Sequence, residues 1–260
     1  MPTAAFASPS LPVDASPIDA SDGLASVGRV GFWSGLAAFA ATAAYVVVQL
    51  AQVAGVVHPP LDAILIYGTS LCIVVPFVLE MVALHHLTRP SRRFWTHAAL
   101  MFTVMYAVFV TANYVVQLAT VIPATTAGLS DGMRVLEQTP HSMFWDFDAL
   151  GYVCMGIATL LAVPALGSVG FERWVRRSLL ANALVTPLIG IVYFHPRFST
   201  RLLFVGSPWG ITAPLFMLLL AIALRRRGDY PIAAARDTLS RCDPSAIRST
   251  SPSTAAATIG

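Results

Sequence analysis

The chain has 260 residues, of which 56% are hydrophobic and only 11% charged, whereas a soluble domain carries about 25% charged residues. All sixteen basic residues are arginine, and the absence of lysine excludes a Schiff-base lysine and a phosphate-binding P-loop. The net charge of +3 is small, so we expect the lipid bilayer, and no nucleic acid, as a partner.

The two ends of the chain differ from its middle. Residues 1–28 and 228–260 are rich in Ala, Ser and Pro, and we expect both to be disordered tails. Residues 29–227 contain six apolar runs, which are 30–55, 62–87, 94–122, 143–166, 178–194 and 203–224. Since a helix needs about 20 residues to cross a bilayer core of about 30 Å, residues 29–227 are predicted to form an all-α transmembrane bundle of six spans. The fifth run is short and holds Pro187, so it is the weakest span.

The arginines indicate the orientation of these spans. With the N-terminus inside, the inner side holds ten arginines, which are Arg29, Arg89, Arg92, Arg93, Arg173, Arg176, Arg177, Arg225, Arg226 and Arg227. The outer side holds three, which are Arg134, Arg197 and Arg201. Because arginine favours the cytoplasmic side of short loops, both termini are predicted to be cytoplasmic. The use of arginine and alanine is typical of GC-rich coding, so we expect a bacterial source and the inner (plasma) membrane.

Polar side chains inside a hydrocarbon core are costly, and they are the first candidates for a functional site. Toward the outer side we select six of them, which are Gln49, Gln52, Asn113, Gln117, Asp148 and Tyr152. Gln117 and Asp148 both lie about 8 Å below the outer boundary at about 1.5 Å per residue. Together the six can line an outward polar pocket for a small polar solute or a cation. Alternatively, the side-chain amides form hydrogen bonds between helices and only stabilise the bundle.

Toward the inner side, Glu80 is the deepest acid, and no arginine of the core can pair with it. It is either protonated or placed in a hydrated vestibule, and either state suits proton coupling. His85, His86 and His97 flank the next loop, but adjacent histidines point in different directions on a helix. We therefore expect no metal site there, and no cofactor elsewhere in the chain.

Three functions remain open. The first is a small-solute or ion transporter or binding protein that uses the outer polar residues. The second is a membrane-embedded, metal-dependent hydrolase that uses His141, Asp146 and Asp148. The third is a non-catalytic subunit of a membrane complex or an oligomer, in which a stripe of small residues forms a packing face; its members are Ser34, Ala38 and Thr42.

One part of the chain resembles a known group. The stretches NYVVQL at 113–118, HSMF at 141–144 and DALGY at 148–152 are similar to an uncharacterised group of bacterial six-span membrane proteins. The resemblance covers the second to the fourth span and implies no activity. It does place Asn113, Gln117 and Asp148 in the recurring stretches.

Overall fold

The structure is a computed structural model, and it describes residues 17–129 and 132–241. The described residues form helices and no strands. The helices are α1 (Pro17–Val53), α2 (Leu61–His86), α3 (Arg93–Val116), α4 (Ile122–Thr126), α5 (Met143–Ala162), α6 (Gly170–Phe194), α7 (Thr200–Gly206) and α8 (Trp209–Arg241). A π-helical turn, Gln117–Val121, joins α3 to α4. It precedes Pro123, which cannot donate a backbone hydrogen bond, so the distorted turn lets one continuous rod pass this proline.

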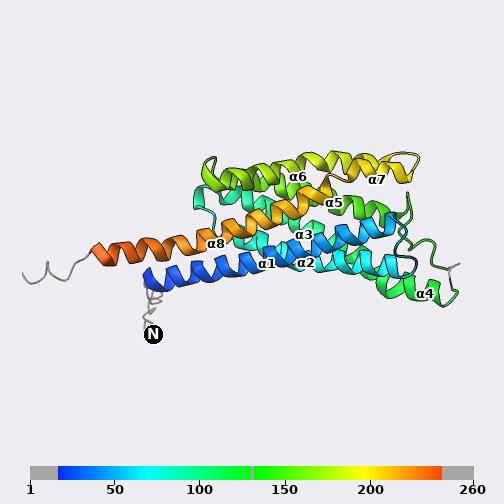
Figure 1. Cartoon of the computed structure of the whole chain (residues 1–260), viewed down its shortest axis with the longest axis horizontal. Coiled ribbons are helices and arrows are strands. Elements are labelled where there is room, and N and C mark those ends of the chain that lie inside the picture. Colours follow the sequence, from blue (N-terminus) through cyan, green and yellow to red (C-terminus); the bar gives the residue numbers. More distant parts are fainter. Residues whose placement is uncertain (1–16, 130–131, 242–260) are drawn as a thin grey trace, which may run out of the picture.

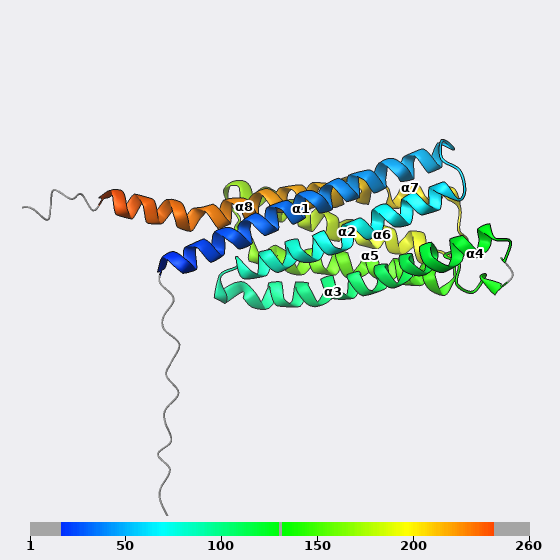
Figure 2. The same ribbon diagram turned by 90° about the horizontal axis from the view of Figure 1, so that it is seen from below.

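The six long helices lie side by side and alternate in direction (Figures 1 and 2). Their packing follows the chain from α1 to α2, α3, α5, α6 and α8, and α8 packs in turn against α1. The bundle is therefore a closed ring in which the first and the last span are neighbours. Helices α1 and α8 both extend at the same end, so the chain enters and leaves the bundle on one side (Figure 1).

Six helical segments of the described chain are long and apolar enough to cross a membrane, which supports the predicted multi-pass architecture. Parts of both predicted tails are helical in the structure, because α1 begins at Pro17 and α8 continues to Arg241. Proline is favoured at a first helical position, which is consistent with the start of α1 at Pro17. The outermost parts of both tails lie outside the described residues.

The fifth span is longer than its apolar run, because α6 starts at Gly170 and has 25 residues. At about 1.5 Å per residue it is about 37 Å long, enough to cross a bilayer. Its first two turns carry Arg173, Arg176 and Arg177. Arginine is a good helix former, but a search for apolar runs leaves these turns out of the span.

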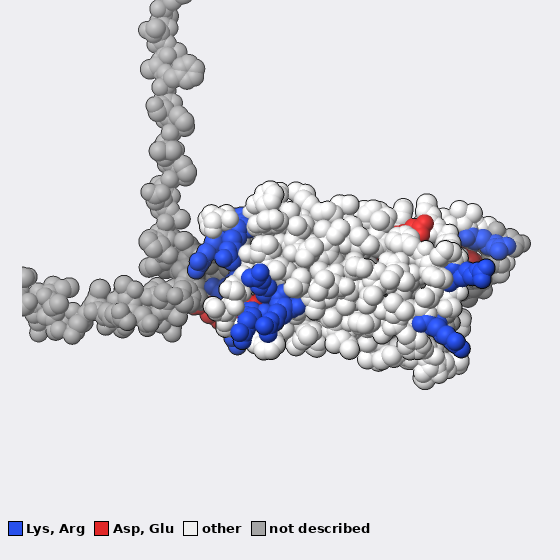
Figure 3. Space-filling model, turned by 90° about the horizontal axis from the view of Figure 1, so that it is seen from above, with Lys and Arg blue, Asp and Glu red and all other residues white. Residues whose placement is uncertain are grey.

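Arginine gathers at the two ends of the molecule, and a broad band between them is nearly free of charge (Figure 3). Large apolar side chains are exposed along this band, among them Val47, Val75, Val108 and Leu184. A belt of this kind fits contact with lipid rather than with water. Inside the ring, Phe77 stacks edge-on against Tyr106 and Phe216, at 5.5 Å and 5.8 Å between ring centroids.

Helices α1 and α8 approach closely through small residues. Gly28 lies opposite Gly228 at the end where both helices extend, and the side chains of Ala38 and Thr42 are fully buried deeper in the bundle. The Thr42 hydroxyl lies 3.2 Å from the sulfur of Met217 on α8. Ala38 and Thr42 of the predicted stripe are therefore buried within the chain, where small residues let two helices approach closely.

We expect Gly28→Ala to lower the free energy of unfolding by about 1–2 kcal/mol, because overpacking forces the two backbones apart. An added Cβ at Gly28 would lie 2.7 Å from the Cα of Gly228 and 3.0 Å from the carbonyl oxygen of Leu224. Gly23→Ala is the matched control, since a Cβ there meets nothing within 4 Å. Unfolding of both variants in mixed detergent micelles, followed by circular dichroism, measures the difference. Equal stability of the two variants would contradict the close contact.

Candidate functional site

Asp148 is the centre of a polar network near the end of the bundle opposite to the one where the chain enters, which is the predicted outer end. It lies on α5 and is only 3% exposed. Its carboxylate accepts hydrogen bonds from the hydroxyl of Tyr114 on α3 (2.6 Å), the side-chain amide of Gln138 (3.0 Å) and the hydroxyl of Tyr193 on α6. Three donors from three segments therefore enclose one acid.

Gln138 fastens the connection between α4 and α5 onto α3. Its side-chain oxygen accepts a hydrogen bond from Asn113 (3.0 Å), and its backbone N–H donates to the side-chain oxygen of Gln117 (3.2 Å). The amide nitrogen of Gln117 donates to the carbonyl of Leu136 (2.7 Å). Gln117 and Asp148, which are predicted to lie at the same depth, thus belong to one hydrogen-bonded network. Gln138 of the α4–α5 connection joins them and covers this network.

A second chain of polar groups runs outward along α1. The hydroxyls of Tyr152 and Tyr45 lie 3.2 Å apart, and Tyr45 donates to the side-chain oxygen of Gln49 (3.1 Å). Gln49 donates to Gln52 (3.0 Å), and Gln52 donates to the carboxylate of Asp62 at the start of α2 (3.0 Å). Five polar side chains therefore lead from the middle of the ring toward its outer end.

A cavity of about 190 Å³ opens beside this chain, between α1, α5, α6, α7 and α8. Polar and aromatic groups line its inner part, which are Tyr45, Gln49, Tyr152, Tyr193 and Trp209. Its rim includes Leu50, Val53 and Phe204, which are exposed by 64%, 46% and 64%. The cavity therefore combines an apolar, exposed rim with a floor of hydroxyl and amide groups.

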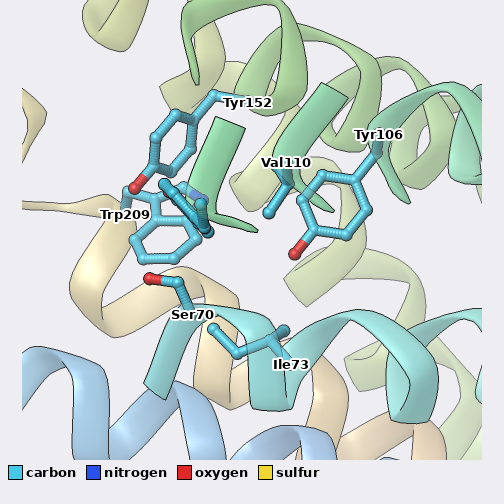
Figure 4. Close-up of a pocket in the computed structure, with 7 residues that line it drawn as sticks. Ser70, Ile73, Tyr106, Val110, Tyr152 and Trp209 are labelled. Carbon is cyan, nitrogen blue, oxygen red and sulfur yellow. The ribbon is translucent and has the colours of Figure 1, made fainter. Parts of the chain in front are cut away.

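A second cavity of about 10 Å³ lies further inside, lined by Ser70, Tyr106, Tyr114, Tyr152 and Trp209 among others (Figure 4). This volume suits a single water molecule. The Ser70 hydroxyl points toward Trp209 and Tyr152 in this view. Because Tyr152 and Trp209 line both cavities and Tyr114 also contacts Asp148, the small cavity connects the two networks.

The structure divides the six outer candidates into two groups. Gln49, Gln52 and Tyr152 belong to the chain along α1, with Gln49 and Tyr152 on the larger cavity. Asn113, Gln117 and Asp148 belong to the network around Asp148 and do not line the larger cavity.

Sequence reasoning missed the partners Tyr45, Asp62, Tyr114, Gln138 and Tyr193. Tyrosine is common at membrane interfaces, so these gave no distinct signal, and Gln138 lies outside every apolar run.

Glu80 is fully buried on α2, and neither of its carboxylate oxygens has a hydrogen-bond partner among the described residues. It faces α1 at Gly35, where an added Cβ would collide with the carboxylate, and the methyl group of Ala221 on α8 borders the same spot. The missing side chain of Gly35 therefore makes room for this acid.

The inner histidines have ordinary local partners. His85 shares a hydrogen bond with the Thr96 hydroxyl (2.9 Å), and His86 is bonded to the carbonyl of Val82 (3.0 Å). The rings of His85 and His97 lie 5.8 Å apart. Within residues 17–129 and 132–241, no group of three or more His, Cys, Asp or Glu side chains is placed to hold a metal ion.

The residues of the hydrolase alternative differ in their exposure. His141 and Asp146 are exposed, whereas Asp148 is buried. His141 has a left-handed backbone (φ 67°) just before Ser142, whose hydroxyl caps α5 by accepting from the N–H of Trp145. In the described structure His141 forms no hydrogen bond or ion pair with either aspartate.

Six helices of the described chain are thus long and apolar enough to cross a membrane, and they enclose the polar groups described above, which supports a multi-pass membrane protein. No protein-family model, curated protein or solved structure matches the chain. The candidate site is therefore interpreted from its own geometry.

Proposed function

We propose that this chain is a bacterial inner-membrane protein that binds or carries a small solute at the cavity between α1, α6 and α8. We infer that both termini are cytoplasmic. The support for this orientation is the division of arginines, with ten at the end where the chain enters and three at the other. The observation that carries the function is the cavity of about 190 Å³ with an apolar rim and a floor of hydroxyl and amide groups.

The size of the cavity limits the solute. An engineered protein cavity of about 150 Å³ holds one benzene molecule, so about 190 Å³ admits one ring with a small substituent. The rim favours a molecule that is soluble in lipid, and the floor favours one with a hydrogen-bonding group.

The charges near the cavity further limit the class of solute. Tyr193 lies between the cavity and the carboxylate of Asp148, to which it donates a hydrogen bond. Among the described residues, no arginine lines the cavity. A neutral or cationic solute is therefore favoured over an anionic one, and the faces of Tyr45, Tyr152 and Trp209 also attract cations.

Three probes of similar size test this proposal, which are benzyl alcohol, benzylamine and benzoate. Equilibrium dialysis of the radiolabelled probes against the protein in nanodiscs, with empty nanodiscs as blank, measures their affinities. We expect benzyl alcohol and benzylamine to bind at least about tenfold more tightly than benzoate, which is about 1.4 kcal/mol. Absence of binding above the blank for all three would overturn the proposed solute class.

Gly206 offers a matched pair of variants at the cavity wall. An added Cβ there lies 3.5 Å from Val192 and 3.9 Å from Ile189, which is ordinary contact, so Gly206→Ala fits. Gly206→Leu extends into the space that these side chains line and is expected to lower probe affinity at least about tenfold. Gly206→Ala is expected to change it less than about threefold. If Gly206→Leu binds the probes as the unchanged chain does, the solute lies elsewhere.

A further inference from the structure

The largest cavity of the three described lies at the arginine-rich end, where its volume is about 730 Å³. Its walls come from the start of α1, the α2–α3 connection, the α5–α6 connection and the inner part of α8. Five arginines line it, which are Arg89, Arg92, Arg93, Arg226 and Arg227, together with a single acid, Glu172. Residues far apart in the sequence thus converge on one strongly basic cleft.

The acid does not neutralise this cleft, because it is already paired. Glu172 accepts from Arg227 at 2.8 Å and from the backbone N–H of Gly167 at 2.5 Å. The other four arginines form no ion pair with a carboxylate of the described residues. The cleft therefore presents four uncompensated positive charges.

Neutral contacts fix three of these four arginines at the cleft. Arg92 donates to the carbonyl of Leu166 (3.2 Å), and Arg93 donates to that of Thr88 (3.1 Å). Arg226 stacks 4.2 Å over the ring of Phe171. Each contact orders a guanidinium without removing its charge.

We propose that this cleft binds the phosphate head group of an anionic phospholipid. Guanidinium groups match phosphate oxygens with paired hydrogen bonds, and basic pockets between membrane helices suit anionic head groups. Apolar side chains line the same cleft, among them Leu24, Leu87, Val169 and Phe171, and they offer contact to the acyl chains of a lipid. A free phosphate ion makes no favourable contact with these apolar walls, whereas a lipid at the membrane boundary contacts both the arginines and the apolar side chains.

The general preference of arginine for the cytoplasmic side accounts for basic loops but not for their convergence. Arg29 and Arg176 are exposed at the same end and do not line the cleft. They form no hydrogen bond or ion pair with the described residues, so they serve as matched controls of equal charge.

Lipid binding to the purified full-length chain in non-ionic detergent tests the proposal. Native mass spectrometry counts adducts of phosphatidylglycerol and of phosphatidylcholine with identical chains, with and without excess inorganic phosphate. We expect a preference for phosphatidylglycerol of roughly 25-fold, at roughly fivefold for each of two arginines in contact. Arg89→Gln with Arg226→Gln is expected to remove most of it, and Arg29→Gln with Arg176→Gln to leave it within about twofold.

Three results would overturn the site. Equal binding of the two lipids excludes recognition of charge, and an equal loss in the control double variant shows attraction by the whole basic end. Displacement of phosphatidylglycerol by inorganic phosphate assigns the cleft to the free anion. Because Arg226 packs on Phe171, the double variant can lose stability, so the single variant Arg89→Gln is measured as well. Arg89 has no partner among the described residues, and we expect this variant to fold. An unchanged preference for phosphatidylglycerol in Arg89→Gln also counts against the site.

Discussion

Replacing Asp148 with leucine is expected to lower the free energy of unfolding by about 3 kcal/mol. Three donors, the buried Tyr114 and the partly buried Gln138 and Tyr193, lose their common acceptor in this variant. A hydrogen bond contributes about 1 kcal/mol net, and pairs inside membranes average about 0.6 kcal/mol with a maximum near 1.7. Leaving the donors buried without partners adds to this cost.

Two further variants separate the network from a general effect of the site. Asp148→Asn keeps one acceptor oxygen, so we expect about half the loss of Asp148→Leu. Asp146→Leu removes an exposed acid two residues away on the same helix and is expected to change stability by less than about 0.5 kcal/mol. Unfolding in mixed micelles measures all three, and a leucine variant as stable as the unchanged chain would show that the network contributes nothing.

Replacing Glu80 with methionine is expected to have the opposite sign and to raise the free energy of unfolding by about 1–3 kcal/mol. Both carboxylate oxygens are buried without a partner among the described residues, and a buried polar group without a hydrogen bond costs about that amount. Methionine has a similar length and no polar atom to desolvate. The same micelle unfolding measures this gain.

Glu172→Met is the control for Glu80→Met, because Glu172 is paired with Arg227. We expect it to destabilise by about 0.5–1 kcal/mol, since this ion pair is partly exposed. A loss of stability in Glu80→Met would show that the acid has a partner such as a bound water. A gain would mean that the protein retains a destabilising group, as proteins do where an acid serves a function, and would support the prediction from the sequence that Glu80 suits proton coupling.

The spans could be predicted from the sequence because the thickness of a bilayer sets one length for all of them. The start of α6 could not, since Arg173 and Arg176 interrupt the apolar pattern while the helix continues through them. The depth of Gln117 and Asp148 could likewise be counted along the chain.

Their partners could not be predicted, because membrane helices are apolar on most sides and their rotation is not fixed by a polar face. Only the packed ring turns Tyr114 and Tyr193 toward Asp148. The fold of the α4–α5 connection was equally hidden, because Gln138 contacts Asn113 through tertiary structure alone.

The contact between the first and the last span makes the order of synthesis important. About 150 residues are made between the end of α1 at Val53 and the start of α8 at Trp209. At roughly 5–20 residues per second this takes about 8 to 30 seconds, during which α1 is inserted without its main partner. Over that interval Gly28 and Gly35 of α1, and Glu80 of α2 beside Gly35, lack the α8 residues that face them and are open to lipid or to the insertion machinery. A nascent chain stalled before α8 would therefore display a polar, unclosed seam by which quality-control proteases can distinguish it from the finished ring.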